Sequence, residues 1–247
     1  MAKQVGLFRT MALIGGGVAA ALVGLAFAGT PFGGDDTGFI PPAANYKCEA
    51  GFAKNAAKAA AAVIKCHIKA AGAAFAAKPF DEEGCEAAAV AKAAASNLKL
   101  TGCPTCLNTA AQAAIIGSAV GALDSSNGVF FCGGSVLFGG DDTGKIPSSK
   151  DELKCESGAI KNVGKLTKAI VKCHIKYAAA VIKAKAFDEE ACETAAKGKF
   201  DAANAKLTVC PACLSALFPA LGGAVEGQID TLNGGTWCAS PSGAFID

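Results

Sequence analysis

Apolar residues recur at helical spacing along two long stretches of the chain. In the second stretch, the residues at alternating intervals of four and three are Ala159, Val163, Leu166, Ile170, Cys173, Tyr177 and Ala180. This spacing places them on one face of an α-helix. We therefore predict long helices over residues 44–77 and 151–184.

Two further helices are predicted after each long one. Asp81 and Asp188 each precede a pair of glutamates, which is typical of an N-cap followed by a first helical turn. A C-P-x-C element then predicts the start of a third helix, because proline is well tolerated in the first turn. We expect this helix to end near Asn127 and Asn233, with a kink at Pro219 in the second copy.

The elements occur twice because the sequence repeats. F-G-G-D-D-T-G starts at residues 32 and 138, K-C-H-I-K at 65 and 172, F-D-E-E at 80 and 187, and C-P-x-C at 103 and 210. The order is the same in both copies. The prediction is an all-α fold with two tandem homologous, disulfide-stapled helical-bundle modules of about three helices each, residues 29–136 and 137–247. Each module is expected to fold by itself.

Residues 1–28 have the pattern of a signal peptide. Lys3 and Arg9 supply positive charge, residues 10–28 are apolar and uncharged, and Ala26-Phe27-Ala28 matches a cleavage site. The alternative is an uncleaved membrane anchor, but the apolar run is barely long enough and is rich in glycine. We therefore predict an exported protein, periplasmic or extracellular, with no stable membrane span in the mature chain.

Charge narrows the choice of partners. The chain has 23 basic and 21 acidic residues, and removing residues 1–28 takes away Lys3 and the only arginine, Arg9, so the mature chain is neutral. Neutrality argues against a nucleic-acid binder and against a polybasic membrane-surface protein. Without arginine, phosphate recognition is also disfavoured. A small apolar ligand or a protein remains as the expected partner.

The 12 cysteines divide equally between the repeats. They are Cys48, Cys66, Cys85, Cys103, Cys106 and Cys132, then Cys155, Cys173, Cys192, Cys210, Cys213 and Cys238. An even number of cysteines in an exported chain predicts structural disulfides.

Helix geometry narrows the pairing of these cysteines. Cys66 and Cys85 lie on facing antiparallel helices, which predicts a bond between them. Cys48 and Cys132 are expected to take Cys103 and Cys106, in an order that the sequence leaves open, with equivalent bonds in the second repeat and none between the repeats.

The C-P-x-C elements also suggest a thiol–disulfide oxidoreductase, because a cysteine at a helix N-terminus has a lowered pKa. No βαβ pattern precedes either element, so a structural role is preferred.

His67 and His174 are the only histidines. On a helical wheel His67 points away from Lys65 and Lys69 into the apolar face, and the same holds for His174. Two interpretations arise: a zinc or copper ligand, or a neutral buried imidazole bonded to a backbone carbonyl or a polar side chain. Neighbouring cysteine and histidine diverge by about 100° on a helix. We therefore favour buried core histidines and predict no metal ligand, cofactor or catalytic residue.

The acidic turn that contains Asp35 and Asp36 is interpreted as a polar turn, because a calcium loop would supply more oxygen ligands. The sequence thus favours an exported Cys-rich helical protein with a structural or binding role rather than an enzyme. Thiol–disulfide exchange and metal binding are the two alternatives.

Overall fold

The computed structural model describes residues 30–133, 141–240 and 244–246, so the predicted signal peptide lies outside the described residues. These residues are mostly helical, as predicted. The helices are α1 (Tyr46–Phe75), α2 (Glu82–Asn97), α3 (Thr109–Phe130), α4 (Lys150–Ile182), α5 (Glu189–Asn204), α6 (Ala212–Ser215) and α7 (Phe218–Thr236). A 3-10 turn, η1 (Thr105–Leu107), precedes α3. Strands β1 (Thr30–Pro31) and β2 (Phe39–Ile40) pair antiparallel.

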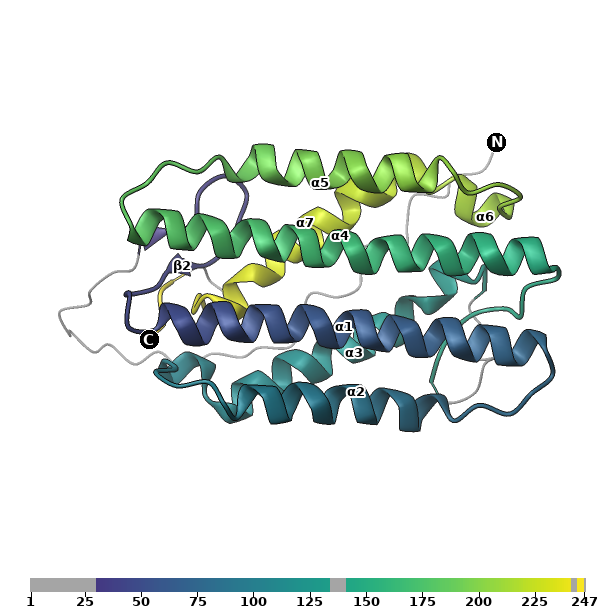
Figure 1. Cartoon of the computed structure of the whole chain (residues 1–247), viewed down its shortest axis with the longest axis horizontal. Helices are drawn as coiled ribbons and strands as arrows, with labels where there is room; N and C mark the ends of the chain where they lie inside the picture. The colour runs from purple at the N-terminus through teal and green to yellow at the C-terminus, as the bar shows by residue number, and fades with distance from the viewer. Residues whose placement is uncertain (1–29, 134–140, 241–243, 247) are drawn as a thin grey trace.

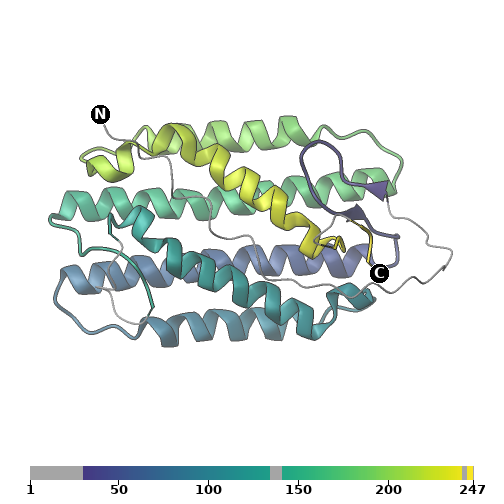
Figure 2. The ribbon, with the colours of Figure 1, turned by 180° about the vertical axis from the view of Figure 1, so that it is seen from behind.

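The helices form two layers. Helices α2, α1, α4 and α5 lie side by side in the front layer (Figure 1), and α3 and α7 cross behind them diagonally (Figure 2). The two long helices meet closely at Gly164, where an added Cβ would lie 3.2 Å from Ile64 Cδ1. None of the described helices is long and apolar enough to cross a membrane.

The predicted seams face the interior. Ala159, Leu166 and Ile170 of α4 are at most 2% exposed and pack in one apolar cluster with Phe200 of α5 and Leu221 of α7. The clusters rely on many small side chains, so cross-links between elements matter for stability.

The capping pattern correctly predicts the start of the second helix in each repeat, whereas the C-P-x-C pattern does not predict the start of the long third helix. Asp81 and Asp188 cap α2 and α5, with their carboxylates accepting from Gly84 N and Ala191 N. In the first repeat the C-P-x-C element forms only the 3-10 turn η1, and α3 starts later, capped by Asn108. In the second repeat the element opens the four-residue helix α6, and the long helix α7 starts separately at Phe218. Pro219 lies in the first turn of α7, where a proline begins a helix without bending it.

Helices α3 and α7 also run further than predicted, to Phe130 and Thr236, beyond Asn127 and Asn233.

Six disulfides connect these elements, and no cysteine of the described residues is free. Four lie within a repeat: Cys66–Cys85, Cys48–Cys103, Cys173–Cys192 and Cys155–Cys210. Two join the repeats: Cys106–Cys238 and Cys132–Cys213. The predicted Cys66–Cys85 bond is confirmed, and Cys48 takes Cys103.

The expectation that no disulfide joins the repeats is wrong, and the length of α3 explains why. Cys106 lies just before this helix and Cys132 just after it, and the 22 residues of α3 hold their ends about 33 Å apart. Two cysteines at opposite ends of a straight helix cannot bond to each other. Helix α3 crosses the rear of the molecule (Figure 2), and Cys132 after it bonds Cys213 of the second repeat instead.

Peptide mapping without reduction checks this pairing. We expect peptides that join Cys106 to Cys238 and Cys132 to Cys213. Changing Cys106 and Cys238 together to serine should lower the free energy of unfolding by about 2–5 kcal/mol, because the bond closes a loop across a sequence separation of 132 residues. A peptide joining Cys106 to Cys132 would contradict the structure. The independent folding of residues 29–136 and 137–247 stays a prediction, which these two bonds oppose.

Candidate metal centre

Both histidines are buried, as the helical wheel predicted. His67 on α1 is 0% exposed and His174 on α4 is 1% exposed. Their surroundings differ from the single polar partner expected, because each imidazole Nε2 faces several carboxylates. Cys66 and Cys173, the neighbouring cysteines, are in disulfides and are therefore not ligands.

The first cluster, here called the His67 centre, joins α1, α2, α3 and the segment before α4. Its acidic members are Glu82, Glu86, Asp124 and Asp142. A carboxylate oxygen of each lies near His67 Nε2, at 3.8, 2.7, 3.3 and 3.1 Å respectively. Four acidic side chains from three separate elements thus converge on one nitrogen atom.

The second cluster, the His174 centre, has the same composition. Its acidic members are Asp36, Glu189, Glu193 and Asp230. Their oxygens lie 3.0, 3.5, 2.8 and 3.4 Å from His174 Nε2. Each member matches a member of the His67 centre at an offset of 106 or 107 residues in the sequence.

Local sequence explains how α2 and α5 contribute. Glu82 and Glu86 are four residues apart on α2, so their side chains lie on one face of the helix. The Asp81 cap fixes where that helix begins. The Cys66–Cys85 disulfide then joins α1 to α2 directly beside both His67 and Glu86. The same arrangement holds His174, Glu189 and Glu193 in the second repeat.

The threonine of D-D-T-G places the remaining aspartate. Thr143 Oγ1 accepts from Gly128 N and donates towards the carbonyls of Asp124 and Ser125, while Asn127 Nδ2 donates to Thr143 O. These bonds fasten the segment to α3 next to Asp124, and so direct Asp142 into the His67 centre. Thr37 makes equivalent bonds with Asn233, Gly234 and Asp230 O of α7.

The two D-D-T-G segments are exchanged between the repeats. Asp36 follows β1 at the start of the first repeat, yet it belongs to the His174 centre. Asp142 belongs to the second copy of the motif and completes the His67 centre. Phe32, which packs against Trp237 and Tyr177, anchors the first segment on the second repeat. Neither centre is built from one predicted module alone.

The carboxylates are buried without enough partners. Every side chain of the two centres is at most 7% exposed. Both carboxylate oxygens of Asp142, Glu82, Asp36 and Asp230 lack a hydrogen bond of good geometry. Even with an imidazolium at its middle, each centre would hold three uncompensated negative charges if all four carboxylates were ionised. Burying such charge is costly unless a cation balances it.

The pKa values of several side chains in the two centres are raised by burial or by the neighbouring carboxylates. Burial, with the neighbouring Glu86 carboxylate, raises the pKa of Glu82 to about 8, and burial raises the pKa of Asp142 to about 7. Burial also raises the pKa of Glu189 to about 9. Burial alone would lower the pKa of His174, but the facing carboxylates raise it to about 11. In the absence of a metal, Glu82, Glu189 and His174 therefore retain protons at neutral pH, and Asp142 is about half protonated.

The spacing of the donor atoms suits a metal ion. Ligands at right angles on an ion with bonds of about 2.1 Å lie about 3 Å apart. Most of the distances from the two Nε2 atoms fall near this value, between 2.7 and 3.5 Å. Groups from both centres have one potential ligand atom per residue, all within 4.8 Å of one another.

The C-P-x-C elements do not form the pair that thiol exchange requires. Cys103 bonds Cys48 while Cys106 bonds Cys238, so the two cysteines of the element have separate partners. Cys210 and Cys213 likewise bond Cys155 and Cys132. This arrangement supports a structural role for the elements.

Comparison of the chain with protein-family models, with curated proteins and with solved structures finds no match. The chemistry of the two centres is therefore the basis for assigning a function.

Proposed function

We propose that this protein is an exported metal-binding protein that holds one multivalent cation in each of its two buried centres. The observation that carries the proposal is the convergence of four buried carboxylates on each imidazole nitrogen, many of their oxygens without a hydrogen bond. A cation supplies the missing positive charge and uses those oxygens as ligands. The six disulfides, which suit an oxidising compartment, and the predicted signal peptide support export.

The donor set indicates which cations fit. Four carboxylates favour hard cations, while an imidazole favours first-row transition metals over Mg²⁺ and Ca²⁺. Manganese and iron satisfy both preferences, and Zn²⁺ competes because it binds most nitrogen and oxygen sites more tightly than Mn²⁺ does. Copper(I) is disfavoured because the thiols that it prefers are in disulfides. We assign manganese or iron as the cation class.

The burial of the centres favours retention of a cation over chemistry on a substrate. A catalytic metal keeps a position open to solvent or substrate. Here each ligand side chain is at most 7% exposed, and five donor residues surround the site. The hollows lined by Lys65 and Lys168 contain no residue of either centre. The proposed role is therefore to bind and hold the ion.

Metal stoichiometry tests the proposal. The protein would be stripped with a chelator, incubated with excess Mn²⁺, desalted and analysed by mass spectrometry for metals. We expect two equivalents in the wild type, one in His67→Ala, one in His174→Ala, and close to none in the double variant, because each imidazole belongs to one centre. Mg²⁺ at the same concentration should not be retained.

The matched control is Glu156→Gln. Glu156 is another buried acidic residue on α4, 3% exposed, that belongs to neither centre. This variant should keep two equivalents, and circular dichroism should show that all variants remain helical. Two equivalents retained in the double histidine variant, or none in the wild type with Mn²⁺, Fe²⁺ or Zn²⁺, would contradict the proposal.

A further inference from the structure

The neutral composition hides a strongly basic exterior. All 21 lysines of the predicted mature chain are among the described residues, and each is exposed or half-buried. Of the 20 acidic residues described, nine are buried, and the Asp36 side chain is only 1% exposed. On the outside of the part of the chain that the structure describes, there are therefore 21 lysines against 10 acidic residues. The neutral net charge therefore does not argue against binding to polyanions or membrane surfaces, because half of the acidic residues are buried.

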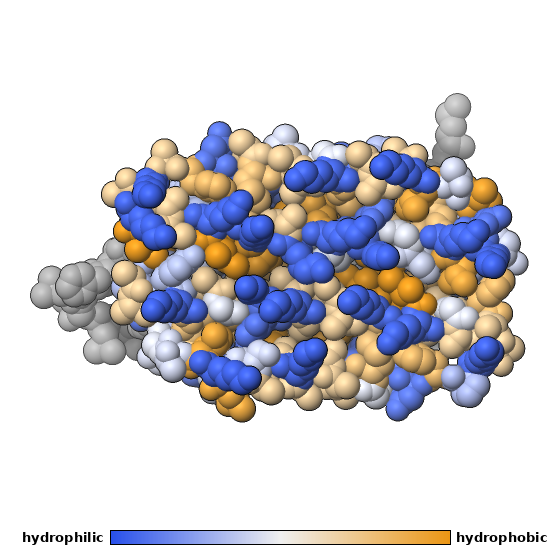
Figure 3. Space-filling view, in the orientation of Figure 1, coloured by the Kyte–Doolittle hydropathy of each residue, from blue (hydrophilic) through white to orange (hydrophobic). Residues whose placement is uncertain are grey.

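The lysines are concentrated on one layer. Helices α3 and α7, at the rear, contain no lysine. On the front layer, α1 after Glu49 and α4 after Glu156 contain no acidic residue. These two stretches present nine exposed lysines, namely Lys54, Lys58, Lys65, Lys69, Lys161, Lys165, Lys168, Lys172 and Lys176. We call this set the lysine face. Figure 3 shows hydrophilic side chains spread in rows over the whole front layer.

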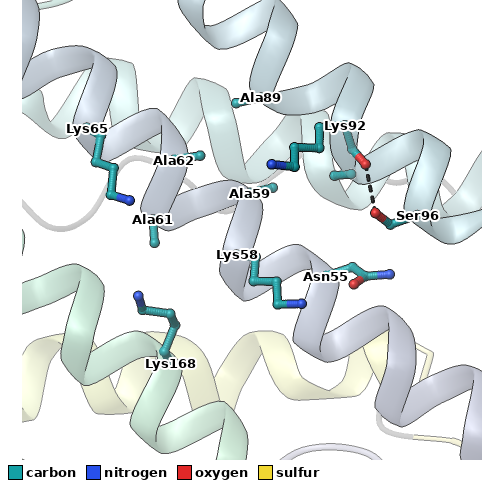
Figure 4. Close-up of a pocket in the computed structure, with 11 residues that line it drawn as sticks. Asn55, Lys58, Ala59, Ala61, Ala62, Lys65, Ala89, Lys92, Ser96 and Lys168 are labelled. Atoms are coloured by element: carbon teal, nitrogen blue, oxygen red, sulfur yellow. Dashed lines mark hydrogen bonds between the residues drawn. The ribbon is translucent and has the colours of Figure 1, made fainter.

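Apolar surface lies between the rows of lysines. One hollow between α1 and α4 is lined by Ile64, Ile68 and Gly164 together with Lys65 and Lys168. Beside it, Lys58 and Lys65 of α1 and Lys168 of α4 surround Ala61 (Figure 4). Lysines that rest their methylene groups on an apolar floor and extend their ammonium groups outwards are typical of proteins that lie on lipid head groups.

From these observations we infer that the lysine face docks the protein on an anionic phospholipid bilayer. The partner is planar because the lysine face spans the two long helices α1 and α4, which lie side by side (Figure 1), and the helices of the opposite layer have no lysine. Lysine, a point charge without the planar fork of arginine, suits the non-specific field of a membrane surface. A linear polyanion would need only one narrow stripe of charge.

Vesicle co-sedimentation of the full mature chain tests this inference. We expect binding to vesicles of phosphatidylcholine with about 30 mol% phosphatidylglycerol and none to phosphatidylcholine alone. Binding should fall at least tenfold when NaCl is raised from about 0.1 M to about 0.5 M, because salt screens exposed charges. The test variant reverses four charges of the lysine face: Lys58→Glu, Lys65→Glu, Lys161→Glu and Lys168→Glu. It should lose at least tenfold in vesicle affinity.

The control variant changes the net charge equally but leaves the lysine face intact. It reverses four lysines in loops outside the four front helices: Lys78→Glu, Lys145→Glu, Lys185→Glu and Lys206→Glu. This variant should lose less than threefold. Equal losses in the two variants, or no binding to anionic vesicles, would overturn the inference. Binding to soluble polyphosphate or heparin without binding to vesicles would overturn it in favour of a soluble polyanion. A circular dichroism spectrum that matches that of the wild type shows that the test variant is folded.

Discussion

Asp36→Asn should empty the centre that contains His174, although Asp36 lies far closer in sequence to His67. In a His67→Ala background, only the His174 centre still binds metal. Adding Asp36→Asn should then abolish the remaining equivalent of Mn²⁺, because Asp36 contributes a buried oxygen 3.0 Å from His174 Nε2. We expect at least a hundredfold loss of affinity, measured by calorimetry on chelator-treated protein.

Asp142→Asn in the same background is the matched control. Asp142 is the equivalent residue of the other D-D-T-G motif, and its oxygen lies 3.1 Å from His67 Nε2. Since the His67 centre is already disabled, this change should leave the remaining equivalent intact. In a His174→Ala background the two results should reverse. If each aspartate substitution instead abolishes Mn²⁺ binding at the centre that contains the histidine of its own repeat, the assignment of Asp36 and Asp142 to the two centres is wrong.

The exchange of segments could not be predicted from the repeats alone. The sequence shows that D-D-T-G occurs at the start of each copy, but a motif at a boundary fits either neighbour equally well. The deciding contacts are the hydrogen bonds of Thr37 to the last turns of α7, which lie 193 to 197 residues away. No local pattern encodes a contact of that range.

The sequence contains a pattern from which the buried glutamates of the two centres could be predicted. Glu82 and Glu86 recur as Glu189 and Glu193 in the second repeat, four residues apart in both copies. Because Glu82 and Glu189 follow an N-cap, the sequence analysis assigns them to a first helical turn and does not predict that they are buried. Treating Asp36 as part of a polar turn had the same effect. A pair of acidic residues on the inner face of a helix, repeated opposite a buried histidine, indicates a metal centre better than composition does.

The helical elements were predictable for a different reason. The seams of α1 and α4 depend only on residues three and four apart, and the Asp81 and Asp188 caps only on residues within one turn. The error at the start of α3 arose because the prediction placed the helix start at Pro104, whereas Asn108 supplies the cap. The partner of Cys132 depended on the length and direction of a whole helix, which a local rule does not consider.

The metal-free protein should become less stable as pH rises, and the metal-loaded protein should not. Between the unfolded values near 4 and the folded values, Glu82, with a pKa of about 8, and Glu189, with one of about 9, bind more protons in the folded state. Stability then falls with increasing pH. His174, with its pKa raised to about 11, acts in the same direction above its unfolded value of about 6.5. We expect the melting temperature of chelator-treated protein to fall by about 10 °C or more from pH 5.5 to pH 8.5.

A bound cation reverses this trend, because it requires the same carboxylates in their ionised form and competes with protons for them. The stabilisation by excess Mn²⁺ should therefore grow from pH 5.5 to pH 8.5, as measured by the melting temperature with and without the ion. Glu156→Gln separates the pH dependence of the metal-free protein from the stabilisation by Mn²⁺. Burial raises the pKa of Glu156 to about 7, so its removal should reduce the pH dependence of the metal-free protein while leaving the response to Mn²⁺ unchanged. A metal-free melting temperature that stays constant or rises over this range would show that the buried carboxylates ionise without cost. The charge imbalance on which the metal assignment depends would then be absent.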